Sequence, residues 1–315
     1  MVDEGGLAAV IGAVYTGGMH RLLLIVLFVA SCASAHPAVE QIAIIEQEKL
    51  VEASGLARSQ IHPGILWAMN DGGHKPRVYA FDESGKHRGR LTIDPSVNRD
   101  WEDLASFTLD GKPYLLVADI GDNDSRHDTL MLYVVEEPDI EDDDKVRNEP
   151  AWVIEFRYPD GPRDAESVAV DVNEGFVYVL SKRSIPPELY RVPLVPSDGV
   201  ITAEKLGQVR SLPPPRRIDV ELAPRIKDWF WQPVAMDFSA DGRTAIVMSY
   251  RYVFVYRRNE DEGWFVTLNR RPSPISLGGF RDAESAVISA DGASVFVTTE
   301  RDFPPLLKAP LPARD

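Results

Sequence analysis

Short apolar runs recur along the chain from residue 40 onward, and clusters of glycine, proline, aspartate and asparagine separate them. The runs are rich in β-branched and aromatic residues and lack a period of 3.6, so they predict short strands rather than helices. They fall into five successive units, and each unit opens with a run that leads into a turn containing glycine. With their turns, these opening runs span 54–64, 101–111, 165–175, 233–242 and 283–292.

Each unit continues with further apolar runs. The second runs span 65–71, 114–123, 176–183, 244–251 and 294–302, and the third runs span 77–84, 130–138, 188–194, 252–258 and 306–311. A fourth run follows in the first four units, at 87–94, 151–159, 204–212 and 263–271. Four strands per unit, repeated along the chain, are typical of β-propeller blades.

The last unit lacks a fourth run, but the segment 40–50 precedes the first unit and can supply it. Such a pairing would close the ring and remove an exposed edge strand. We therefore predict an all-β fold, a β-propeller of five blades that is closed by an N-terminal strand. A sixth blade within 205–232 is the alternative, although the prolines of that segment favour a long loop. A pair of β-sandwiches fits the pattern less well.

The first 35 residues differ from the rest of the chain. From Met19, a short basic start precedes an apolar run over 22–30 and then small residues, which is the layout of a secretory signal. The apolar run is too short to span a bilayer as a helix. We predict that Met19 is the true start, that 1–35 is a signal segment and that 36–315 forms one propeller domain.

Two cleavage sites compete at the end of the signal segment. Residues 33–35 (ASA) suit ordinary signal peptidase, whereas 29–32 (VASC) resembles a bacterial lipobox, which would leave Cys32 lipidated. Both alternatives predict export, either to the periplasm, to the outer membrane as a lipoprotein, or to the medium. Cys32 is the only cysteine, so no internal disulfide can form and stability must come from packing.

The charge balance limits the partners of the chain. There are 49 acidic residues against 34 basic ones, a net charge of −15. Nucleic acid and anionic membrane surfaces both need a basic face, so neither is expected as a partner, and membrane contact is expected only through a lipid anchor. The six histidines show no zinc-binding spacing. We expect a monomer.

In a propeller the first strand of each blade lines the central channel. The equivalent residues near the start of the five opening runs, which we call the ring residues, are Ser54, Glu102, Glu166, Val234 and Glu284. Carboxylates that share a narrow channel repel one another unless they are neutralised. Calcium accepts six to eight oxygens in irregular geometry, so we predict Ser54, Glu102, Glu166 and Glu284 as calcium ligands. The alternative is that each glutamate binds backbone amides or an arginine.

The ends of the second strands place polar residues at one rim, where a rigid scaffold can present a binding site. The candidate ligand-binding residues are Asp71, Asp119, Asp122, Asn123, Lys182, Arg183, Arg251, Glu300 and Arg301. Their mixed charges favour a small anionic ligand or substrate, such as a phosphate bridged to a central cation, and a cell-envelope protein is the alternative partner. The acids two positions before the ring glutamates and Ser54 are expected to orient loops; these are Glu52, Asp100, Asp164 and Asp282.

Two motifs, DWEDLA (100–105) and DIGDND (119–124), stand out beside SGLARS (54–59) and RDAES (163–167). Together they resemble a family of exported bacterial β-propellers of unassigned activity, many of which are labelled as esterase-like or phytase-like. The resemblance covers nearly all of 50–310. The ring of serine and glutamates is also similar to that of the calcium-activated nucleotidases, the five-bladed apyrases, which implies calcium at Ser54, Glu102, Glu166 and Glu284. Val234 departs from that pattern, because the nucleotidases have a serine there.

The chain contains no GxSxG motif, no phosphate loop and no dinucleotide fingerprint. If it is an enzyme, water activated by a metal ion is the mechanism that its residues favour. The sequence thus predicts an exported calcium-binding propeller that hydrolyses a phosphorylated or ester substrate. The alternatives are a non-catalytic envelope propeller with a structural metal, and a lipoprotein that scavenges or senses small anions.

Overall fold

A computed structural model describes residues 39–141, 144–213, 231–280 and 282–313. All of them lie in the unit His36–Asp315. The signal segment, its start at Met19 and the lipidation candidate Cys32 lie outside the described residues. No helix in the described ranges is long and apolar enough to cross a membrane.

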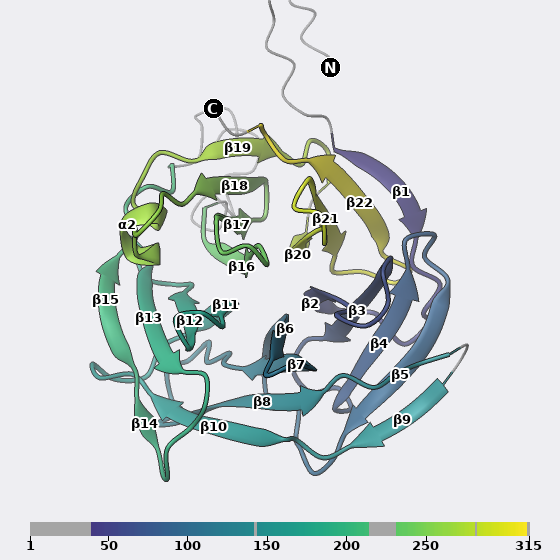
Figure 1. Ribbon diagram of the computed structural model, residues 1–315, viewed down its shortest axis with the longest axis horizontal. Coiled ribbons are helices and arrows are strands. Elements are labelled where there is room, and N and C mark those ends of the chain that lie inside the picture. Colours follow the sequence, from purple (N-terminus) through teal and green to yellow (C-terminus); the bar gives the residue numbers. More distant parts are fainter. Residues whose placement is uncertain (1–38, 142–143, 214–230, 281, 314–315) are drawn as a thin grey trace, which may run out of the picture. The chain divides into compact units, whose positions relative to one another are not determined.

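The described strands form five sheets, and these are the five blades of a β-propeller (Figure 1). Their innermost strands contact one another in a closed circuit, which confirms the expected all-β fold with five blades. Blade one contains β2 (Ala53–Arg58), β3 (Ile65–Asn70), β4 (Arg77–Asp82) and β5 (His87–Ile93). Blade two contains β6 (Trp101–Leu109), β7 (Lys112–Asp119), β8 (Leu130–Glu136) and β10 (Trp152–Arg157), and blade three contains β11 (Ala165–Asp171), β12 (Phe176–Ser181), β13 (Glu188–Pro193) and β15 (Glu204–Gln208).

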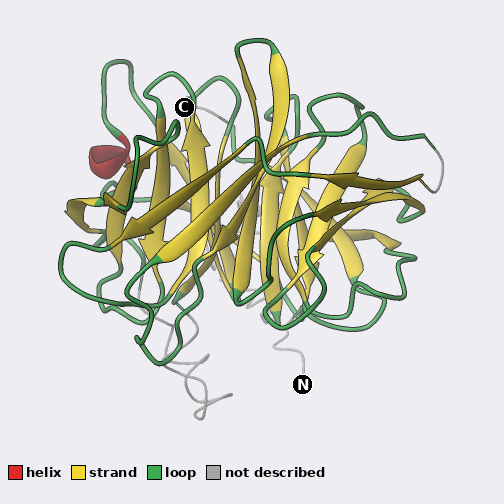
Figure 2. Cartoon of the chain, turned by 90° about the horizontal axis from the view of Figure 1, so that it is seen from below, coloured by secondary structure: helices red, strands yellow, loops and turns green. Residues whose placement is uncertain are grey.

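The last two blades complete the circuit. Blade four contains β16 (Pro233–Phe238), β17 (Thr244–Ser249), β18 (Tyr252–Arg257) and β19 (Ser273–Ser276). Blade five contains β20 (Ala283–Ile288), β21 (Ser294–Thr299) and β22 (Pro305–Pro310), and its outer strand is β1 (Glu40–Ile44). Strand β1 pairs antiparallel with β22, so the N-terminal strand closes the ring as predicted. The view in Figure 2 shows the strands of the blades with the loops at their ends.

Two short strands that the apolar pattern did not predict extend blades one and two. Strand β9 (Asp144–Asn148) adds to β5 in parallel, and β14 (Ile201–Thr202) adds to β10 in parallel. Strand β9 is strongly polar (DKVRN), which explains why an apolar pattern does not reveal it. Both strands cover an outer edge that would otherwise expose unpaired backbone groups.

The prediction of a fourth strand over 263–271 is wrong, because this segment contains the helix α2 (Trp264–Leu268) and the fourth strand is β19. Trp264 is 1% exposed, stacks on Phe238 with 3.8 Å between ring centroids, and donates its indole N–H to Asp171 Oδ2 at 2.7 Å. The next residue, Phe265, packs where Gly207 has no side chain. A helical turn lets two consecutive aromatic residues pack inward, whereas a strand would direct them to opposite faces.

The hydrophobic core consists of five clusters of buried residues, and each cluster lies between two neighbouring blades. The strands bury both faces, since each sheet packs against the sheet before it and the sheet after it. This explains why the second strands are nearly continuous apolar runs, such as FVYVLS in β12. The packed blades form a rigid support for the residues at the ends of the inner strands.

Candidate cation site at the channel mouth

Each inner strand carries a β-bulge at its ring residue. The register against the second strand shifts between Ala53 and Gly55, and the corresponding shift occurs in the other four inner strands around Glu102, Glu166, Val234 and Glu284. A bulge inserts one extra residue and redirects its side chain, and bulges are frequent next to functional sites. The ring residues interact with one another, because Ser54 Oγ donates to the Glu102 carbonyl at 2.7 Å and the charge of Glu166 acts on Glu102 and Glu284. They therefore share one end of the channel, which we call the channel mouth.

Three carboxylates converge at this mouth. Asp71 follows β3, Asp100 precedes β6, and Glu102 is the bulge residue of β6. One oxygen atom of each lies within 4.8 Å of the others, and among the described residues this is the group of three that could hold a metal ion. Only Glu102 belongs to both this group, which we call the acid cluster, and the predicted calcium ligands.

Two glycines leave the space that the acid cluster occupies. A Cβ atom added at Gly121 would lie well within 3.0 Å of Glu102 Oε1 and Asp100 Oδ2, and one added at Gly72 would collide with Asp100 Oδ1. The loop after β7 also holds Asp100 through its backbone, since Gly121 N–H donates to the Asp100 carbonyl at 3.1 Å. The segments NDGG (70–73) and DIGDND (119–124) thus form a cradle for the carboxylates of Asp100 and Glu102.

Burial changes the protonation of the acid cluster. Burial, together with the nearby charges of Asp71 and Asp164, raises the pKa of Asp100 to about 6. Burial also raises the pKa of Asp71, and it raises that of Glu102, which is 4% exposed, well above the usual range, with Glu166 adding to the effect. Carboxylates that are held together against their repulsion, and away from water, gain most when a cation neutralises them.

The other predicted calcium ligands have different partners. Glu166 forms a buried ion pair with Lys182, and burial raises the pKa of Glu166 to about 7. Glu284 shares a hydrogen bond with Glu300, and burial raises the pKa of Glu284 to about 9. The structure therefore places these two glutamates at the mouth but outside the acid cluster.

Several of the predicted rim residues have partners within the fold. Asp119 accepts the Asp100 amide at 2.9 Å, and Asp122 accepts the amides of Arg126 and His127, so both carboxylates stabilise loops. Arg183 binds Asp164 at 2.7 Å and also Asn123. Exposed Arg301 donates to Thr299 at 2.9 Å, and Arg251 is half-buried.

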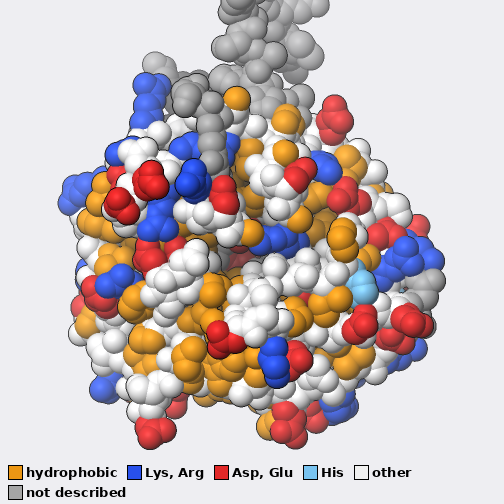
Figure 3. All heavy atoms as spheres, viewed as in Figure 1, with side chains coloured by type: hydrophobic (Ala, Val, Ile, Leu, Met, Phe, Trp, Pro, Cys, Tyr) orange, Lys and Arg blue, Asp and Glu red, His pale blue; other side chains and the backbone are white. Residues whose placement is uncertain are grey.

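Sequence reasoning gave one residue of this site a different role. Asp100 was expected to orient a loop, yet it belongs to the acid cluster; its place in DWEDLA, two positions before Glu102, was the available signal. Tyr250, which follows β17 and was expected at the rim beside Arg251, interacts with the Lys182 ammonium, which lies 5.5 Å from its ring centroid. Acidic and basic side chains are interspersed on the face shown in Figure 3, so surface charge alone does not mark the site.

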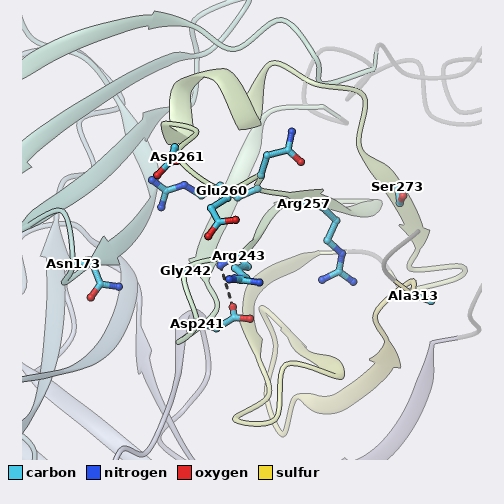
Figure 4. Close-up of a pocket in the computed structure, with 11 residues that line it drawn as sticks. Asn173, Asp241, Gly242, Arg243, Arg257, Glu260, Asp261, Ser273 and Ala313 are labelled. Atoms are coloured by element: carbon cyan, nitrogen blue, oxygen red, sulfur yellow. Dashed lines mark hydrogen bonds between the residues drawn. The ribbon is translucent and has the colours of Figure 1, made fainter.

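A hollow of about 550 Å³ lies at the opposite end of blade four (Figure 4). It is lined by the turn after β16, with Asp241 and Arg243, and by the segment after β18, with Glu260 and Asp261. The ring residue of blade four is near the start of β16, whereas this turn follows its end. The hollow is therefore separate from the channel mouth.

No family model and no curated protein matches this chain. Among solved structures, a luciferin-regenerating enzyme has 10% identity and a TM-score of 0.45, with 87% of this chain and 95% of that chain covered. A gluconolactonase from Xanthomonas campestris has 13% identity and a TM-score of 0.46, with 88% and 90% covered. Likeness at this level does not indicate an activity, so the function has to be inferred from the channel mouth.

Proposed function

We propose that the channel mouth binds a divalent cation, with calcium the best fit, and that the protein is a cation-dependent hydrolase of a phosphorylated or ester substrate. The acid cluster carries this proposal: oxygens of Asp71, Asp100 and Glu102 lie within 4.8 Å of one another. Calcium binds oxygens at about 2.3–2.6 Å, so two ligands on opposite sides of the ion stand about 4.8 Å apart. The spacing therefore suits this ion without a large rearrangement.

The donor set also favours calcium over transition metals. All three groups of the acid cluster are carboxylates, which are hard oxygen ligands. Calcium takes six to eight oxygens, so positions would remain for water and for a substrate oxygen. A bound cation would polarise that oxygen and lower the pKa of bound water.

Another residue of the channel mouth, Glu284, can donate a proton. Glu284, with a pKa of about 9, carries a proton at neutral pH and is hydrogen-bonded to Glu300. A protonated carboxyl beside a reacting group can act as a general acid. The position of Glu284 at the mouth gives the chain a proton donor of its own for a leaving group.

A non-catalytic, ligand-binding role with a structural metal is the second candidate. It is favoured by the engagement of several mouth groups with the fold itself, since Glu166 is paired with Lys182 and Ser54 donates to a backbone carbonyl. Turnover of phosphate monoesters, nucleoside diphosphates and aryl esters in calcium, and its loss in chelator, distinguishes the enzyme from the binding protein.

The experiment that tests cation binding is a calorimetric titration of calcium into the wild-type protein and into Glu102→Gln. Glu102→Gln keeps the shape of the side chain and removes its charge, so we expect a loss of affinity of at least about tenfold. Glu260→Gln, at the opposite end of blade four, removes the same charge from an exposed position and should leave affinity unchanged. Equal binding by the wild type and Glu102→Gln would place the cation elsewhere, and no binding by the wild type would end the proposal.

A further inference from the structure

The channel mouth also holds a cationic group. Lys182 follows β12 in blade three and is only 7% exposed. Its ammonium pairs with Glu166, which keeps Lys182 charged although burial opposes the charge. A buried charge persists only where partners stabilise it. The fold therefore maintains a positive charge on Lys182 at the channel mouth.

Blade four contributes no acid to the ring. Its ring residue is the buried Val234, and this blade instead offers the phenol of Tyr250, whose ring centroid lies 5.5 Å from the Lys182 ammonium. Burial raises the pKa of Tyr250, so the phenol keeps its proton at neutral pH and is a hydrogen-bond donor. Apart from Glu166 and Glu284, which have partners of their own, the mouth is therefore polarised, with the acid cluster on blades one and two and the Lys182–Tyr250 pair on blades three and four.

We propose that this polarity selects the ligand: an oxyanion of a small molecule, either a carboxylate or a phosphoryl group, binds between the cation and the Lys182–Tyr250 pair. The inference rests on the proposed cation site, because the acids of the mouth would repel an anion if no cation neutralised them. Calcium needs more oxygens than the acid cluster supplies, and the oxyanion would fill open positions of the ion. An ammonium has three hydrogens, and Glu166 accepts one of them, so a further hydrogen can serve the oxyanion.

The two ligands should bind cooperatively. The cation must bind before the oxyanion, and each must increase the affinity of the other by the same factor. Lys182 has opposite effects on the two ligands, since its charge repels the cation and attracts the oxyanion. A merely structural lysine would not produce effects of opposite sign.

Ligand-observed NMR titrations test the inference with two probes that share a ring, phenylphosphonate and benzoate, each with calcium and with chelator. Calorimetry gives the calcium affinity of the same samples. In the wild type, we expect at least one probe to bind only with calcium, and the probe that binds more tightly identifies the oxyanion as phosphoryl or carboxylate. In Lys182→Met, we expect calcium affinity to rise a fewfold and probe affinity to fall about tenfold or more. Tyr250→Phe should weaken the probe with little effect on calcium.

The control is Arg243→Met, which removes an exposed positive charge in the hollow at the opposite end of blade four (Figure 4). It should change neither affinity. If the wild type binds calcium but neither probe, or if Lys182→Met and Arg243→Met behave alike, the oxyanion inference is overturned and the cation site stands. If the wild type binds no calcium, the proposed function fails first. A fall of both affinities in Lys182→Met, without a rise for calcium, would show a structural role and also overturn the inference.

Discussion

Gly121→Ala is the substitution whose effect on the acid cluster follows most directly from the structure. The added methyl group would lie well within 3.0 Å of Glu102 Oε1 and Asp100 Oδ2. Both atoms are ends of flexible side chains, so the carboxylates can retreat while the backbone stays in place. The backbone of Gly121 does not have a positive φ, so alanine is not strained there.

The retreat is large compared with a calcium–oxygen bond. Moving an oxygen by about 1 Å, to ordinary van der Waals contact, lengthens a bond of about 2.4 Å to about 3.4 Å, beyond the range that calcium accepts. Two of three protein carboxylates are affected, so we expect calcium affinity to fall about 100-fold or more. Calcium at 100 times its dissociation constant stabilises the wild type by about 2.7 kcal/mol, and the variant should lose nearly all of this.

The assay is thermal unfolding in excess calcium and in chelator. For a domain of this size, about 2.7 kcal/mol corresponds to a shift of roughly 5 °C or more, which we expect for the wild type only. Gly279→Ala is the matched control, because a Cβ atom at Gly279 meets nothing within 4 Å. A full calcium shift in Gly121→Ala would refute calcium binding at the acid cluster, since the methyl group cannot enter the cradle without moving the carboxylates.

Three further predictions follow from the buried groups and the N-terminal segment. In chelator, the melting temperature should rise as pH falls from 8 to 5. The reason is that Glu166 has a pKa of about 7 in the folded chain, above its ordinary value of 4.5, so the folded state binds the proton more tightly than the unfolded state. Calcium should reverse this trend, because it needs ionised carboxylates, and a melting temperature that does not change with pH in chelator would show that burial does not raise the pKa. Asp103→Ala should lower the free energy of unfolding by about 2–4 kcal/mol in urea titrations, because its carboxylate accepts the buried amides of Val168 at 2.8 Å and Met236 at 3.4 Å on two other blades; unchanged stability would mean that these amides find other partners. Mass spectrometry of the mature protein should show either a lipidated Cys32 or an N-terminus at residue 36, and retention of residues 19–35 would remove the export prediction.

The blade repeat could be predicted from the sequence because each blade has the same local requirements. Apolar runs such as FVYVLS and turns such as ADG (240–242) depend on residues close together in the chain. The error at 263–271 arose where a tertiary contact decided the structure. The run GWFVTL looks like a strand, but the stacking of Trp264 on Phe238 and the space at Gly207 favour a helical turn.

The candidate site was predictable only in part. The repeat identifies which residues enter the channel, and the five bulges place them at one end of it. The repeat does not identify the partners of the ring residues. Lys182, after β12, pairs with Glu166, at the start of β11, through side chains that the repeat does not specify. The acid cluster likewise joins Asp71, from the second strand of blade one, to the start of blade two, and no repeat aligns these positions.

The measurement that tests the cation site most directly is anomalous diffraction from crystals of the protein grown with calcium. We predict a peak between Asp71, Asp100 and Glu102, with an oxygen of each at about 2.3–2.6 Å from the ion. A peak centred instead on Glu166 and Glu284, or no peak at the channel mouth in crystals that hold calcium elsewhere, would contradict it.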